Sequence, residues 1–245
     1  MTNITRNKDK ENPLDVEFSK CEKGHHPTYL KHPPSGLLVR NRGDVGVIID
    51  QYVCYKYLLR IRRFSAATLL DLGANVGASA WWFMINGLAD RVVSVEPDPE
   101  CADIFRANHG TDPRIDIIEA AAVGDEDPSE MDLYLGITYA GCNSLEPYRG
   151  RSTVRVRTVR FTDLVDTHHP TIIKCDVEGS EFRYRWSGLP TCVRIVCAEM
   201  HQNKESWIEL GRRMDEDLLS SGFRHLRKPK HEPMFIKTQI AVWKR

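Results

Sequence analysis

Apolar and polar residues alternate along the chain with two different periods. Short apolar runs such as ATLLDLG (67–73) and TIIKCDVEG (171–179) are bounded by turn residues, which is typical of buried strands. Longer segments repeat apolar residues every three to four positions and end at glycine, which is typical of helices. Strands are predicted at 45–50, 67–73, 91–97, 114–124, 131–137, 153–161, 171–179, 193–201, 223–228 and 238–244. Helices are predicted at 51–64, 76–87, 99–110 and 205–222.

Strands that alternate with helices predict an α/β fold. The expected architecture is a doubly wound, Rossmann-like and mostly parallel sheet with helices on both faces. Residues 46–245 are expected to form this one domain, while residues 1–45 form a polar, proline-bearing lead that is either a flexible tail or a lid. Ligands of such sheets bind at the carboxyl ends of the strands, so the residues that follow each strand are the ones to inspect.

The first of these strand ends carries a glycine turn, in the stretch LLDLGANVGASAWWF (69–83). Asp71 is followed by Gly73 and Gly77, a spacing that lacks the close glycine pair of dinucleotide-binding loops. A carboxylate beside the turn would also repel a pyrophosphate. The turn therefore favours a nucleoside ligand with a cationic group, and S-adenosylmethionine (SAM) is such a ligand.

The second strand end carries an acid. Glu96 follows the run VVSV and lies 25 positions after Asp71. An acid in this place accepts hydrogen bonds from ribose hydroxyls in nucleoside-binding sheets. The alternative is that Glu96 only favours the start of the next helix.

Composition and charge narrow the class of protein. The hydrophobic fraction of 41% is typical of a globular chain, and 34 basic residues cancel 34 acidic ones. This balance argues against a nucleic-acid binder that uses a basic face. The seven cysteines show no CxxC pair, and no apolar run suggests a signal peptide or a membrane span. We expect a soluble, cytoplasmic protein.

Five motifs in matching order resemble the FkbM-type SAM-dependent methyltransferases. They are DLGANVG, SVEPDP, AAVGDED, NSL (143–145) and IIKCDVEGSE, of which the last is the most specific. The likeness runs from about Gly46 to Glu199 and more loosely beyond. It implies a class I methyltransferase fold, with a seven-stranded sheet whose last strand is antiparallel. It also implies O-methylation of sugars, polyketides and related metabolites. The stretch FRYRWSGLP after Glu181 is bulkier and more basic than the family pattern.

The resemblance implies cofactor-binding roles for individual residues. The residues from Asp71 to Gly77 match the first SAM motif, Glu96 matches the ribose acid, and Asp176 matches the acid near the reactive methyl. Ala121 and Ala122 match the loop that passes the adenine. The predicted cofactor-binding residues are Asp71, Gly73, Ala74, Asn75, Gly77, Glu96, Pro97, Ala121, Ala122 and Asp176.

The candidate catalytic residues follow two neighbouring strands. Asp176 and Glu178 come after one strand, and Glu199 and His201 after the next. Adjacent strands lie about 5 Å apart, so these side chains can converge on one pocket. Our hypothesis is that Asp176 and His201 orient and deprotonate an acceptor hydroxyl, since histidine titrates near neutral pH. A divalent cation held by this group, with Asp176 and Glu199 as ligands, is the alternative.

The expected function is thus SAM-dependent methyl transfer to a hydroxyl of a small molecule or glycan, with no nucleic-acid partner. Two alternatives remain open: a non-catalytic SAM- or nucleoside-binding module, and a methyltransferase that acts on nitrogen or on nucleic acid.

Overall fold

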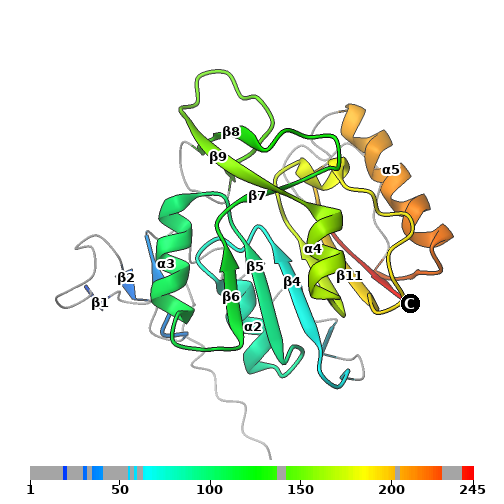
Figure 1. Ribbon diagram of the computed structural model, residues 1–245, viewed down its shortest axis with the longest axis horizontal. Coiled ribbons are helices and arrows are strands. Elements are labelled where there is room, and N and C mark those ends of the chain that lie inside the picture. The colour runs from blue at the N-terminus through cyan, green and yellow to red at the C-terminus, as the bar shows by residue number, and fades with distance from the viewer. Residues whose placement is uncertain are drawn as a thin grey trace, which may run out of the picture.

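The computed structural model describes residues 19–20, 30–31, 35–40, 55, 58–59, 63–136, 142–201, 205–227 and 239–245. Its centre is a seven-stranded sheet in the order β12-β13-β11-β10-β4-β5-β6 (Figure 1). The strands are β4 (Thr68–Leu72), β5 (Arg91–Val95), β6 (Ile115–Ile118), β10 (Ile172–Cys175), β11 (Ile195–Met200), β12 (Arg224–Arg227) and β13 (Gln239–Lys244).

The strand directions confirm the predicted doubly wound sheet. β4, β5, β6, β10 and β11 run parallel to one another. β13 runs antiparallel to both of its neighbours, β11 and β12. The chain order reverses between β4 and β10, since β5 and β6 lie on one side of β4 and the later strands on the other. This is the switch point where α/β sheets bind ligands.

Helices cover both faces of the sheet because successive strand residues point in opposite directions. Leu70 and Leu72 of β4 belong to the same buried cluster as Phe161 of α4 and Leu218 of α5. Leu69 belongs to the cluster on the other face, with residues of α2 and α3. The helices are α2 (Ala78–Ile85), α3 (Pro99–His109), α4 (Phe161–His168) and α5 (Glu205–Ser220).

A second, three-stranded sheet lies beyond the carboxyl ends of the parallel strands (Figure 1). It consists of β7 (Ala121–Val123), β9 (Thr153–Arg160) and β8 (Glu130–Tyr134), with β9 in the middle. A third small sheet joins β1 (Ser19–Lys20), β2 (Leu30–Lys31) and β3 (Leu38–Val39).

The structure differs from the predicted elements in several places. The strand expected at 114–124 is split into β6 and β7, because the amide of Ala120 donates to the carbonyl of Ile118 and this tight turn leads the chain out of the main sheet. Helix α4 was not predicted, although Phe161, Leu164 and Val165 are buried at helical spacing. The strand expected at 45–50 and most of the helix expected at 51–64 lie outside the described residues.

Candidate active site

The glycine turn after β4 packs tightly against the end of β10. Gly73 has a φ of +75°, and a Cβ atom added to it would lie 1.8 Å from the carbonyl oxygen of Asp176. Asn75 also adopts a left-handed φ, of 50°. Gly77 has a φ of +91°, and its Cβ would lie 2.4 Å from the ring of His109 on α3. The turn therefore needs glycine at both places, because protein atoms fill the space that a Cβ would take.

A buried ion pair lies directly beneath this turn. Nζ of Lys174 is 3.2 Å from Oδ1 of Asp71, and these two residues face each other across the β4–β10 pair. Lys174 also donates to the carbonyl of Gly73 at 2.7 Å, and the hydroxyl of Ser79 donates to Oδ2 of Asp71. Burial acts to lower the pKa of Lys174, but Asp71 and Asp176 outweigh it and raise that pKa, so the side chain is charged.

This pairing changes the expected role of Asp71. Its side chain is fully buried and both oxygens have protein partners, Lys174 and Ser79. The carboxylate thus stabilises the turn through Lys174, which binds the carbonyl of Gly73. Direct contact of Asp71 with a cationic ligand stays a prediction. Lys174 is not among the predicted site residues, although a lysine inside the apolar run IIKC is itself a sign of a buried charge partner.

Glu96, the predicted ribose acid, follows β5 and faces the same turn. Its two carboxylate oxygens accept hydrogen bonds from the backbone amides of Asn75 (2.7 Å) and Asp98 (2.9 Å). Burial raises the pKa of Glu96 to about 7. Pro97 follows Glu96, and Asp98 then caps α3 by accepting from the amide of Glu100. Two acids therefore stand at the start of α3.

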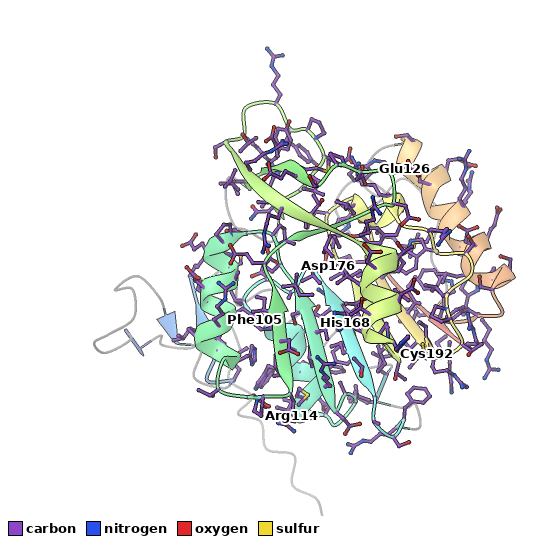
Figure 2. The ribbon with its side chains drawn as sticks, viewed as in Figure 1. Phe105, Arg114, Glu126, His168, Asp176 and Cys192 are labelled. Atoms are coloured by element: carbon purple, nitrogen blue, oxygen red, sulfur yellow. The ribbon has the colours of Figure 1, made fainter. Side chains whose placement is uncertain are left out.

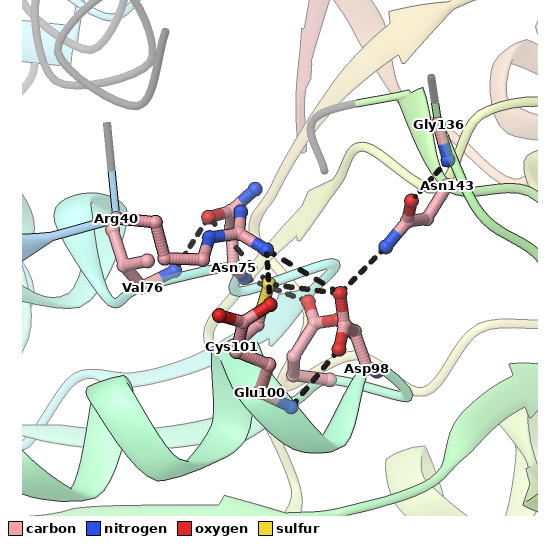
Figure 3. Close-up of polar contacts among 9 residues, drawn as sticks. Arg40, Asn75, Val76, Asp98, Glu100, Cys101, Gly136 and Asn143 are labelled. Atoms are coloured by element: carbon pink, nitrogen blue, oxygen red, sulfur yellow. Dashed lines mark hydrogen bonds and ion pairs between the residues drawn. The ribbon is translucent and has the colours of Figure 1, made fainter. Parts of the chain in front are cut away.

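Two distant segments converge on Asp98 (Figure 3). Nδ2 of Asn143, from the segment between β8 and β9, donates to Oδ2 of Asp98 at 2.7 Å, and Nη1 of Arg40 lies 3.4 Å from the same oxygen. Arg40 belongs to the predicted lead. Residues 37–39 of that lead are buried and are held by Asn108 of α3, which exchanges hydrogen bonds with Leu38. Part of the lead thus contacts the site, although the sequence does not decide between a flexible tail and a lid.

Ala121 and Ala122 lie on β7, where the chain leaves the main sheet. Both side chains are buried, and the carbonyl of Ala122 accepts from the hydroxyl of Tyr184 at 3.2 Å.

The bulky stretch after Glu181 has a structural explanation. Tyr184 stacks on Phe161 of α4, with ring centroids 4.8 Å apart, and Arg183 forms ion pairs of 2.8 Å with Asp127 and Glu146.

The four candidate catalytic residues stand at the carboxyl ends of β10 and β11. Figure 2 shows Asp176 at this edge of the main sheet, with Arg114 and Cys192 at the opposite edge. Nε2 of His201 lies 3.3 Å from Oε2 of Glu178 and 3.9 Å from Oδ1 of Asp176. One ligand atom each of Asp176, Glu199 and His201 lies within 4.8 Å of the others. The predicted convergence of the two strand ends is therefore present.

Glu181, which pattern reasoning left without a catalytic role, fixes the orientation of His201. Its Oε1 accepts from the backbone amide of His201 (2.9 Å) and contacts Nδ1 of the ring (3.0 Å). Its Oε2 accepts from the amide of Gly179 at 2.8 Å, and the side chain is fully buried. Glu181 begins the short 3-10 helix η3 (Ser180–Arg183) together with Ser180.

These contacts shift the titration of the cluster. Burial acts to lower the pKa of His201, but Glu181 and Glu178 outweigh it and hold that pKa well above its ordinary value. Burial raises the pKa of Glu178, which His201 partly offsets. Glu178 also has a left-handed φ of 51°, a strained backbone of the kind found at functional sites. These carboxylates therefore favour the protonated form of the His201 ring.

The strand order, the switch point and the glycine turn with its two acids together define a class I methyltransferase. A family model described as "Methyltransferase FkbM domain" matches residues 71–224. The chain belongs to this family of methyltransferases.

Solved methyltransferase structures resemble the chain at low sequence identity. An O-methyltransferase from Bacillus cereus in complex with SAH is 14% identical, with a TM-score of 0.39 over 80% of this chain and 78% of that one. Precorrin-6y C5,15-methyltransferase from Geobacter metallireducens is 13% identical, with a TM-score of 0.42 over 80% and 86%. Fibrillarin from Aeropyrum pernix with bound S-adenosyl-L-methionine is 11% identical, with a TM-score of 0.38 over 74% and 67%. No curated protein sequence matches the chain.

Within the described part of the chain, no helix has both the length and the apolar character that crossing a bilayer requires.

Proposed function

We propose that this chain transfers a methyl group from SAM to a hydroxyl oxygen of a small molecule or glycan. One observation carries the proposal: the acid–histidine cluster adjoins the glycine turn. The carbonyl oxygen of Asp176 lies against Gly73, so close that a Cβ atom there would clash with it. The carboxylate of Asp176 lies 3.9 Å from Nε2 of His201. A cofactor on the turn and an acceptor at the cluster would therefore be neighbours.

The residues around the turn fit SAM. Glu96 and Asp98 offer carboxylate oxygens to a ribose diol, and Ala121 and Ala122 lie on β7, where the resemblance implies the adenine. When bound, the cofactor supplies a methyl group on a positively charged sulfur, so that the acceptor oxygen forms the new C–O bond as the C–S bond breaks and leaves its electron pair on sulfur. The chain then has to hold the acceptor and remove its proton.

The proton of the hydroxyl passes to a carboxylate at the end of β10, Asp176 or Glu178. Both nitrogens of the His201 ring face carboxylates, Nδ1 toward Glu181 and Nε2 toward Glu178. The hydrogen bond from Nδ1 to Glu181 holds the ring among these acids, with Nε2 facing Glu178. It modifies the hypothesis that His201 itself takes the proton. A well-placed base is worth about 10²–10⁴-fold in rate.

Calorimetric titration of the full chain tests the cofactor. We expect S-adenosylhomocysteine (SAH) to bind with a stoichiometry of one and NAD not to bind, because the turn lacks the glycine that admits a pyrophosphate. Binding of NAD without binding of SAH would contradict the proposal.

Transfer of a labelled methyl group tests the reaction. The chain is incubated with SAM carrying a ¹³C methyl group and with metabolite extracts, and the products are read by NMR. Methoxy signals that disappear with Asp176→Asn are the expected result. Labelled N-methyl groups or labelled nucleic acid would point to a different acceptor.

The affinity for SAH should also decrease as the pH is lowered. Glu96 has a pKa of about 7 and accepts ribose hydroxyls best when ionised. It is mostly ionised at about pH 8 and mostly protonated at about pH 6, so the affinity should decrease by about tenfold between them. Calorimetry at both pH values checks this. Glu96→Gln should bind weakly and without this pH dependence, whereas an equal slope in the variant would assign the titration to another group.

A further inference from the structure

Three potential metal ligands converge at the ends of β10 and β11 because of the register of the sheet. Cys175 pairs with Ala198, so Asp176 follows on beside Glu199. Glu199 and His201 are two positions apart and therefore point to the same side of their strand. One donor atom of each of Asp176, Glu199 and His201 lies within 4.8 Å of the others.

The imidazole of His201 is aimed into this group. The residue is only 3% exposed, yet Nε2 makes no hydrogen bond within the described residues. The other nitrogen, Nδ1, contacts the buried carboxylate of Glu181 at 3.0 Å. A carboxylate that holds one ring nitrogen while the other faces outward is the usual arrangement behind a metal-ligating histidine.

The electrostatics favour a cation at the same point. The carboxylates of Asp176, Glu178 and Glu181 lie within 3.9 Å of the His201 ring nitrogens. The ammonium of Lys174 is 3.8 Å from Asp176 but is shared with the buried Asp71, at 3.2 Å. The carboxylates around His201 therefore form an excess of negative charge, which a divalent ion would balance.

We propose that Asp176, Glu199 and His201 bind a divalent transition-metal ion, with Glu181 as the residue that positions His201. One imidazole with two carboxylates suits Mn²⁺ or Zn²⁺ better than Ca²⁺ or Mg²⁺, which prefer oxygen ligands alone. In a tetrahedral site, ligand distances of about 2.0–2.2 Å place the donor atoms about 3.3–3.6 Å apart. The observed spread of up to 4.8 Å therefore requires side-chain movements of about an ångström.

Such an ion would deepen the proposed function, on which this part of the inference rests. Three protein ligands leave coordination positions open, and a hydroxyl bound there loses its proton more readily. With Asp176 occupied by the ion, Glu178 is the carboxylate left to take that proton. Its Oε2 lies 3.3 Å from Nε2 of His201.

Titration of the chelator-treated full chain with Mn²⁺, followed by EPR, tests the site without any methyl acceptor. The signal of free Mn²⁺ should be lost up to one equivalent, and Zn²⁺ should compete. Asp176→Asn, Glu199→Gln and His201→Gln should each weaken binding by at least about tenfold. Glu181→Gln should weaken it by about 10–100-fold, as expected for a residue that orients a ligand.

Glu178→Gln is the matched control, because it removes a charge from the same cluster but no proposed ligand. It should bind Mn²⁺ within a few-fold of the parent chain. Weak binding in Glu178→Gln with normal binding in Glu199→Gln would overturn the ligand set. Circular dichroism and SAH titration of each variant report on folding. A chain that binds SAH but neither Mn²⁺ nor Zn²⁺ would refute the metal site alone, whereas metal binding without SAH binding would refute the proposed cofactor alone.

Discussion

Replacing Lys174 with methionine should destabilise the protein by about 3–5 kcal/mol, because it leaves the carboxylate of Asp71 buried without its cation. Lys174 is 2% exposed and Asp71 is fully buried, so water cannot replace the lost partner. The change also removes the donor to the carbonyl of Gly73. Thermal unfolding should show a midpoint lowered on the order of 10 °C, and SAH affinity should fall because the turn loses its support.

The double variant Asp71→Asn with Lys174→Met is the matched control. It removes both charges, so it should recover a large part of the stability lost in the single variant, since the cost arises mainly from the unpaired charge. A double variant less stable than Lys174→Met would show that the ion pair is not the main interaction of these residues.

Replacing Gly73 with alanine should abolish SAH binding, with an affinity loss of at least about 100-fold. A left-handed φ costs a residue with a Cβ about 1–2 kcal/mol. The added Cβ would also lie 1.8 Å from the carbonyl of Asp176, so the turn or the end of β10 must move. Calorimetry with SAH, together with thermal unfolding, measures both effects.

Gly188 provides the comparison for Gly73. Its φ of +74° is nearly the same, but a Cβ there would meet nothing within 4 Å. Gly188→Ala should therefore cost only the backbone term of about 1–2 kcal/mol and leave SAH binding unchanged. Equal losses in the two variants would mean that the contact with Asp176 has no importance of its own.

The local pattern of apolar and polar residues was sufficient to predict most strands of the sheet and the residues at their carboxyl ends. The parallel strands, the glycine turn and the convergence of Asp176 with His201 follow from periodicity and from the rule that parallel strands end at one edge. The turn at Ile118–Ala120 could not be predicted in this way, because the run from 114 to 124 is apolar on both sides of it.

The parts that were missed depend on contacts between distant segments. Arg40 reaches Asp98 across 58 positions, and Lys174 faces Asp71 across about a hundred. Glu181 meets His201 only because η3 folds back over the end of β11. Periodicity reports which face of an element is buried but not which side chain it will meet. The pKa of His201 depends on these partners, so its expected role changed with them.

The place of β13 in the sheet has a consequence for synthesis on the ribosome. β13 is the last strand in the sequence, yet it inserts between β11 and β12. Until residues 239–244 have emerged, β11 presents an unpaired edge whose residues Ile195–Ala198 are all apolar and are all buried in the finished fold. An exposed apolar edge of this kind invites pairing with other chains. We therefore expect slow addition of β13 to the sheet to favour aggregation through β11.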